Sequence, residues 1–302
     1  MTESIGVMEA LAMVEESPSI DTVELEERAA SLTTDVREPD AAFSPFELAI
    51  RCTDLTSLEA DDTPEKISRL CATAIHPDQE DPAIPSVAAV CVHPALVPTA
   101  VRSLKGTPVK VAGVAGGFPS GDVSTVTKLR EIREVLDMGA DEVDMTLNRR
   151  AFLAGRYRET YEEVASSKDL CGDSRLKVIL ETGELGSYEH IRRASALAMA
   201  AGADFIKTST GKITPGATFP AALCIMETIR ELREEIGRRV GIKVSGGIRT
   251  ADDAGRYLLM LSAVLGPEWL GPDLFRIGAS SLLEELVARV REERRTPPAS
   301  PS

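Results

Sequence analysis

Eight short runs rich in β-branched and other apolar residues recur along this chain of 302 residues, and segments with helical periodicity separate them. Between these runs, apolar residues repeat with a period of about 3.6 over residues 126–138, 188–201, 220–236 and 251–265. Regular alternation of strand and helix, with strands apolar on both faces, indicates a parallel sheet covered by helices. The runs span residues 48–55, 87–94, 109–116, 141–147, 176–183, 204–211, 241–247 and 274–280.

Eight successive βα units predict an α/β fold of the (β/α)₈ TIM-barrel type. The alternative is an open doubly wound sheet, but no G-x-G-x-x-G turn follows the first run to support it. We expect the barrel over residues 46–293, with an acidic N-terminal extension over residues 1–45 and a disordered Pro/Ser-rich tail over residues 294–302. One amphipathic helix is expected within the extension, near residues 4–16.

Charge and composition narrow the function classes. The formal net charge is −14, and residues 1–48 hold 12 Asp or Glu against Arg28 and Arg37, which places −10 of that charge there and leaves about −4 for the rest. Nucleic acids and anionic membrane surfaces attract clustered Lys and Arg, so we expect neither as a partner. Five scattered cysteines resemble reduced core residues, and the N-terminus has no signal-peptide pattern, so a cytoplasmic protein is expected.

Lysines near the carboxyl ends of two runs stand out, because active sites of TIM barrels form at that end. Lys207 and Lys243 come one or two residues before the loop sequences STG and SGG. Neighbouring strands lie about 4.8 Å apart, so two inward-pointing amines at similar height lower the pKa of one or both. Asp144 lies within the run EVDMTL and is the expected partner of Lys243. The alternative is a buried Lys–Asp pair that serves stability alone.

A neutral amine attacks carbonyl carbons and forms an imine, which eases cleavage or formation of a neighbouring C–C bond. We therefore expect Lys207 to attack, Lys243 to depress its pKa and Asp144 to move protons. This chemistry requires no cofactor or metal, and the three histidines have no metal-ligand spacing. Lys110 and Lys177 come second in their runs, and we expect both at the lower rim of the barrel.

Loops after the last runs carry the sequences GK, GGIRT and GASS, which begin at Gly211, Gly246 and Gly278. In TIM barrels, such loops frequently hold a phosphate on backbone N–H groups and a helix N-terminus. A phosphorylated substrate is therefore expected. The structural alternatives are a capping box over residues 281–284 and a tight βα turn at the GG pair.

Together these residues resemble the 2-deoxyribose-5-phosphate aldolase family through DLT, EVDM, LKVILETGEL, ADFIKTSTGK, KVSGGIRT and FRIGASSLL. The resemblance implies reversible cleavage of 2-deoxy-D-ribose 5-phosphate to acetaldehyde and D-glyceraldehyde 3-phosphate, carried out by a homodimer. It implies that Lys207 forms the imine and that Lys243 and Asp144 complete the catalytic set. The implied phosphate ligands are Lys212, Gly246, Gly247, Ser280 and Ser281, and Gly211 and Gly278 belong to the same loops.

Three further residues are expected either to contact sugar hydroxyls or to stabilise a loop: Asp54, Thr56 and Thr210. Two other functions stay open at this point. One is another imine-forming sugar-phosphate aldolase, or a transaldolase, of the same fold. The other is a catalytically idle barrel that binds a sugar phosphate or a protein partner.

Overall fold

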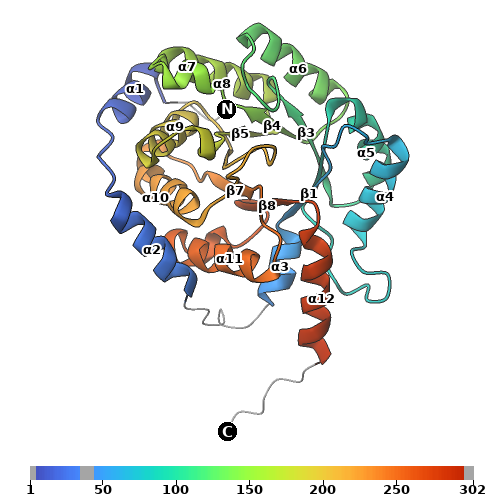
Figure 1. Cartoon of the computed structure of the whole chain (residues 1–302). Coiled ribbons are helices and arrows are strands. Elements are labelled where there is room, and N and C mark those ends of the chain that lie inside the picture. The colour runs from blue at the N-terminus through green and yellow to red at the C-terminus, as the bar shows by residue number, and fades with distance from the viewer. Residues whose placement is uncertain (1–4, 35–43, 296–302) are drawn as a thin grey trace.

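The computed structural model describes residues 5–34 and 44–295, and within them the strands form one closed parallel barrel in sequence order (Figure 1). Strand β8 pairs back onto β1, with Leu55 opposite Ala279, which closes the ring. The predicted α/β TIM barrel is therefore confirmed. The strands are β1 Thr53–Thr56, β2 Ala89–Val92, β3 Lys110–Ala115, β4 Glu142–Thr146, β5 Arg175–Ile179, β6 Phe205–Lys207, β7 Gly241–Ser245 and β8 Phe275–Ala279.

Helices surround this barrel (Figure 1). In the described residues they are α1 Val7–Glu15, α2 Thr22–Thr34, α3 Pro45–Arg51, α4 Pro64–Ile75, α5 Val97–Leu104, α6 Thr125–Asp137, α7 Arg149–Leu153, α8 Tyr157–Cys171, α9 Tyr188–Ala200, α10 Phe219–Ile236, α11 Ala251–Leu265 and α12 Leu282–Arg295. Short 3₁₀ helices are η1 Pro94–Leu96, η2 Thr182–Glu184 and η3 Pro267–Trp269. None of the described helices is both long and apolar enough to cross a membrane.

Local capping signals fix where several helices begin. The hydroxyls of Ser124, Thr218 and Thr250 each accept a hydrogen bond from the backbone N–H three residues later. These bonds satisfy donors that have no partner inside the helix. The four helices expected from periodicity are confirmed as α6, α9, α10 and α11, each within one residue at either end.

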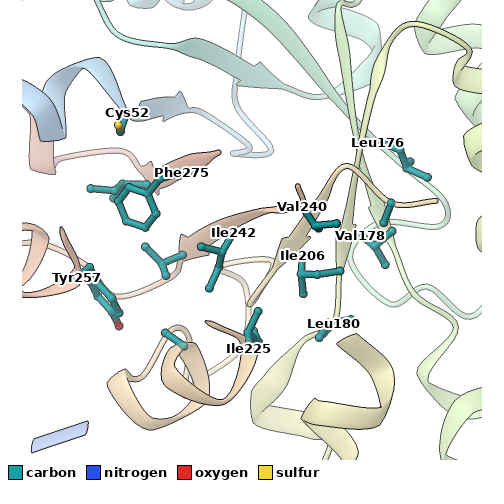
Figure 2. Close-up of a cluster of buried hydrophobic side chains, with 14 of the residues drawn as sticks. Cys52, Leu176, Val178, Leu180, Ile206, Ile225, Val240, Ile242, Tyr257 and Phe275 are labelled. Carbon is teal, nitrogen blue, oxygen red and sulfur yellow. The ribbon is translucent and has the colours of Figure 1, made fainter. Parts of the chain in front are cut away.

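Side chains of the strands alternate between the helices outside and the barrel interior. Ile206 and Ile242 point away from the barrel axis and pack with Ile225 of α10, as Figure 2 shows. Their neighbours Lys207 and Lys243 therefore point inward, and they lie opposite each other in the parallel ladder. The layer between strands and helices is apolar, while part of the interior is charged.

One expected strand is wrong at its start. Residues 48–51 belong to α3, and β1 begins only at Thr53. The Ser44 hydroxyl accepts hydrogen bonds from the N–H groups of Phe46 and Glu47, and Pro45 occupies the first turn. This N-terminal cap favours a helix over the apolar run that follows.

The first two helices, α1 and α2, lie along the outer surface of the barrel (Figure 1). Helix α1, the one expected from the sequence, packs against α8 and α9, while α2, which was not expected, packs against α10 and α11. The Tyr188 hydroxyl lies 2.9 Å from Glu26, and Arg28 forms an ion pair of 2.5 Å with Glu227. At the other end α12 continues to Arg295, so the first two residues of the expected tail are helical, and residues 296–302 lie outside the described residues.

Candidate functional site

Seven charged side chains fill one part of the barrel interior, and each is at most 2 % exposed. They contact one another across the barrel rather than solvent. We call them the interior cluster: Asp54, Glu142, Asp144, Lys177, Lys207, Lys243 and Arg276.

Asp144 of β4 lies at the upper end of this cluster and meets three ammonium groups. Its Oδ2 accepts hydrogen bonds of 2.7 Å from both Lys207 and Lys243, and its Oδ1 accepts one of 2.9 Å from Lys177. Burial alone raises the pKa of Asp144, but attraction to the three amines outweighs burial and holds this pKa well below its usual range. Asp144 is therefore a carboxylate next to two predicted catalytic lysines.

The two lysines of neighbouring strands differ electrostatically. Burial lowers the pKa of Lys207, Asp144 raises it, and repulsion from Lys243 lowers it further, so the net shift is downward. Burial also opposes the charge on Lys243, but Asp144 and Asp54, the latter 2.5 Å away, more than offset it and raise its pKa. The lysine expected to attack is thus the one that loses its proton more readily.

Lys177 contradicts its expected place at the lower rim. It is fully buried in the interior cluster, 2.5 Å from Glu142 and 2.9 Å from Asp144. The parallel register pairs it with Asp144 of β4. Lys110, in contrast, is exposed and lines a cavity at the lower end of the barrel together with Asp141, which agrees with its expected place.

A cavity of about 180 Å³ opens above the cluster, and Lys207 belongs to its lining. We call it the rim cavity. Of the residues predicted to bind substrate, these line it: Thr56, Thr210, Gly211, Gly246, Gly247, Gly278, Ser280 and Ser281. They come from the ends of β1, β6, β7 and β8, and the last two directly precede the N-terminus of α12.

Glycine is needed at two of these positions for close packing. Gly246 has φ +88°, and a Cβ there would lie 3.1 Å from the Cα of Gly216 and 3.3 Å from that of Gly211. A Cβ on Gly278 would lie 2.8 Å from Ser245 and 3.1 Å from the Cε of Lys243. Backbone segments therefore approach one another closely beside the rim cavity, and glycine-rich segments before a helix N-terminus suit an anion.

Two predicted substrate ligands lie elsewhere. Asp54 is fully buried below the cavity, where its carboxylate binds Lys243 and Arg276, so the expected contact with sugar hydroxyls is not supported. The Lys212 amine lies 3.2 Å from Glu59 and is absent from the cavity lining. Arg249, a cation that sequence analysis passed over within GGIRT, lines the cavity instead.

Glu181, also missed, lies at the end of β5 with φ +56° and is the non-glycine residue with positive φ in the described chain. It is buried, and its carboxylate accepts hydrogen bonds from the N–H and hydroxyl of Thr210, at 3.2 Å and 2.5 Å. The Thr210 hydroxyl in turn accepts from the N–H of Lys212. Glu181 thus fixes the loop between Lys207 and the rim cavity, and backbone strain of this kind clusters at functional sites.

Residues 48–267 match the sequence profile of the DeoC/LacD family aldolases. The chain belongs to this aldolase family. The interior lysines and the rim cavity therefore lie in the part of the barrel where a family of C–C bond-cleaving enzymes is expected to carry its active site.

Curated relatives and a solved structure agree with this membership. The deoxyribose-phosphate aldolases of Bos taurus and Mus musculus are 45% and 46% identical to the chain, and each alignment covers 80% of this chain and 79% of the relative. A deoxyribose phosphate aldolase structure from Aeropyrum pernix, described as tetrameric, superposes with a TM-score of 0.62 at 25% identity. That superposition covers 90% of this chain and 99% of the other.

Proposed function

We propose that this chain is a class I aldolase that reversibly cleaves 2-deoxy-D-ribose 5-phosphate to acetaldehyde and D-glyceraldehyde 3-phosphate. One observation carries the proposal: among the amines of the interior cluster, Lys207 is the one that lines the rim cavity, and its pKa is lowered. A buried amine with a depressed pKa is a carbonyl nucleophile. Membership in an aldolase family, and relatives with the deoxyribose-phosphate name, support the substrate.

In the cleavage direction, the neutral Nζ of Lys207 adds to the C1 aldehyde of the open-chain sugar, and loss of water gives a protonated imine. A base takes the proton of the C3 hydroxyl, the C2–C3 bond breaks, and its electron pair moves toward the iminium nitrogen. Glyceraldehyde 3-phosphate leaves, and an enamine stays on Lys207. Protonation of C2 and addition of water then release acetaldehyde and restore the amine.

We assign proton transfer to Asp144 and Lys243, because Oδ2 of Asp144 accepts hydrogen bonds of 2.7 Å from both Lys207 and Lys243. The Lys243 ammonium keeps its charge and disfavours a second one on Lys207. We place the substrate phosphate at the Gly246–Gly247 loop and the Ser280–Ser281 helix start, with Arg249 as a cation that the cavity already contains.

Product analysis tests the proposal directly. Incubation with deoxyribose 5-phosphate is expected to release acetaldehyde, and incubation with acetaldehyde and borohydride is expected to leave an ethyl group on Lys207, found by peptide mapping. Turnover of a keto-sugar phosphate without acetaldehyde release from deoxyribose 5-phosphate would instead favour another imine-forming aldolase or a transaldolase. A protein that binds the sugar phosphate without turnover or adduct would be the idle barrel.

Phosphate recognition gives a second prediction. Unphosphorylated deoxyribose loses several charge-assisted hydrogen bonds, each worth about 1.5–3 kcal/mol. We expect its kcat/KM to be at least about 100-fold below that of deoxyribose 5-phosphate. Steady-state kinetics of both sugars measure this ratio, and equal values would contradict the phosphate site.

Two matched variants identify the cation that contributes. Arg249→Met is expected to lower kcat/KM about 10-fold for the phosphorylated sugar and to leave that of deoxyribose unchanged. Lys212→Met tests the sequence-based assignment, since that lysine reaches the phosphate only after it leaves Glu59. A loss confined to Lys212→Met would return the role to the residue expected from sequence.

The domain limits, the location and the assembly state complete the proposal. We propose residues 46–293 as the aldolase unit and residues 1–45 as an acidic extension whose helices α1 and α2 brace α8 to α11 from outside. We further propose a cytoplasmic location and a homodimer, and light scattering of the full chain measures its assembly state. Arg294 and Arg295 belong to α12, so they are not part of the tail proposed from the sequence.

A further inference from the structure

The interior cluster contains more cations than carboxylates. Three carboxylates, Asp54, Glu142 and Asp144, face four basic groups, Lys177, Lys207, Lys243 and Arg276, and all seven are buried. With every group ionised the cluster carries one net positive charge inside the barrel. An uncompensated buried charge is costly, so one basic group is favoured to give up its proton.

The contacts show which basic group is least supported. Lys243 binds Asp54 at 2.5 Å and Asp144 at 2.7 Å, and Lys177 binds Glu142 at 2.5 Å and Asp144 at 2.9 Å. Lys207 has one carboxylate contact among the described residues, to Asp144, and shares that oxygen with Lys243.

Arg276 completes the lower end of the cluster. Its guanidinium lies 2.6 Å from Asp54 and 2.8 Å from Glu142. It cannot lose its proton in the working range of an enzyme. Each of the other basic groups therefore has two close carboxylates, and Lys207 is left as the surplus cation.

We propose that Glu142, Lys177 and Arg276, in and below the middle of the barrel, are positioning residues that set the protonation of Lys207 through the charge balance of the interior cluster. They do so without contact with the substrate site, because the lining of the rim cavity includes none of them. Glu142 and Arg276 line the cavity at the lower end of the barrel instead. The inference rests on the proposed role of Lys207 as the imine lysine.

Directions of the pKa shifts agree with this charge balance. Burial opposes the charge on Lys177 and Arg276, yet their carboxylate neighbours raise the pKa of both, while that of Lys207 falls. Two cysteines also neighbour the cluster: Cys91 on β2, whose Sγ lies 3.9 Å from Asp144, and Cys52 before β1, near Arg276 and Asp54. Burial raises the pKa of both thiols and keeps them neutral. The groups around Lys207 are thus Asp54 of β1, Cys91 of β2, Glu142 and Asp144 of β4, Lys177 of β5, Lys243 of β7 and Arg276 of β8.

The test is the pH dependence of imine trapping with acetaldehyde and borohydride, measured as adduct on Lys207. Glu142→Gln removes a negative charge and keeps the shape, so the ammonium form of Lys207 is less favoured and the midpoint moves to lower pH. Lys177→Met removes a positive charge, so the net charge of the cluster is zero when Lys207 is protonated. The ammonium form of Lys207 is then more favoured, and the midpoint moves to higher pH. We expect each shift to be about one pH unit.

Two controls separate charge balance from mere stability. Arg276→Lys keeps the charge and is expected to hold the parent midpoint. Glu163→Gln removes a carboxylate from another buried pair, since Glu163 lies 2.8 Å from Lys128 between α8 and α6, outside the interior cluster. It is expected to lower thermal stability and leave the midpoint unchanged.

Opposite shifts for Glu142→Gln and Lys177→Met would support the proposal. Shifts in the same direction, or parent midpoints in both, would overturn it, and if Lys177→Met does not fold, the isosteric Glu142→Gln decides alone. A parent protein without an adduct on Lys207 would instead count against the proposed function. The two failures are therefore distinguishable.

Discussion

Replacement of Lys207 by methionine is expected to reduce turnover of deoxyribose 5-phosphate by at least about 10⁴-fold, because no imine forms without its amine. The fold is expected to survive and even to gain stability. The ammonium form of Lys207 is the surplus cation of the interior cluster. An apolar side chain of similar length removes this poorly compensated amine without leaving a carboxylate unpaired, since Asp144 keeps Lys177 and Lys243. Steady-state kinetics and thermal melting measure the two effects.

Lys110→Met is the matched control. Lys110 is the first residue of β3, at the lower end of the barrel. Its side chain is exposed, and its amine lies 3.6 Å from the carboxylate of Asp141. We expect parental turnover and adduct formation in this variant. An ethyl adduct that persists at full yield in Lys207→Met would show that another amine forms the imine.

Replacement of Lys243 by leucine has the second large effect. Without Lys243, the interior cluster holds three carboxylates and three basic groups, so its net charge is zero when Lys207 is protonated. Lys207 therefore stays an ammonium ion at neutral pH. A lysine at its reference pKa of about 10.4 is only about 0.04% neutral at pH 7. We expect trapping at pH 7 to fall about 100-fold to 1000-fold and to recover about tenfold per pH unit as the pH rises toward 10.

The direction of the change in trapping follows from the fact that only the neutral amine of Lys207 attacks. A lowered pKa leaves the neutral amine present at pH 7, and a restored pKa removes it until the pH rises. Asp144→Asn is the control, because it removes a carboxylate and retains the ammonium groups of Lys177 and Lys243. Turnover is expected to fall while trapping at pH 7 stays largely intact. If Lys243→Leu traps acetaldehyde at pH 7 as fast as the parent, Lys243 acts only in later proton transfer.

Sequence periodicity predicted most of the fold because the barrel repeats one local unit. The wrong segment, residues 48–51, was apolar enough for a strand, but the cap at Ser44 and Pro45 decided for a helix. The missed helix α2 has no comparable apolar face in the sequence, and it exists through its packing on α10 and α11. A local helix cap decides the first case, and tertiary contact decides the second.

The candidate site was less predictable where height in the barrel mattered. Position within its run placed Lys177 at the lower rim, but strands in a closed barrel are staggered, and the register sets it opposite Asp144. Glu142 could have been found, because it precedes Asp144 by two residues and shares its face of the strand. Arg276 could not, since its partners Asp54 and Glu142 lie far away in sequence.

Two rim residues escaped for different reasons. Arg249 lies within GGIRT, but the sequence led us to assign phosphate binding to Lys212 instead. Only the lining of the rim cavity distinguishes the two cations. Glutamate is a common residue in loops, and no sequence pattern around Glu181 predicts its left-handed backbone conformation. Such backbone geometry is imposed by surrounding contacts rather than by the residue itself.

The division of the site between strands and loops bears on how such an enzyme can diversify. The amine and the charged groups of the interior cluster are built into β1, β4, β5, β6, β7 and β8, whereas the groups around the rim cavity come mainly from the loops that follow the strands. Loops of a TIM barrel tolerate exchange better than its strands. New acceptor aldehydes are therefore reached by rebuilding the segments after Gly211, Gly246 and Gly278, while the nucleophile is inherited unchanged.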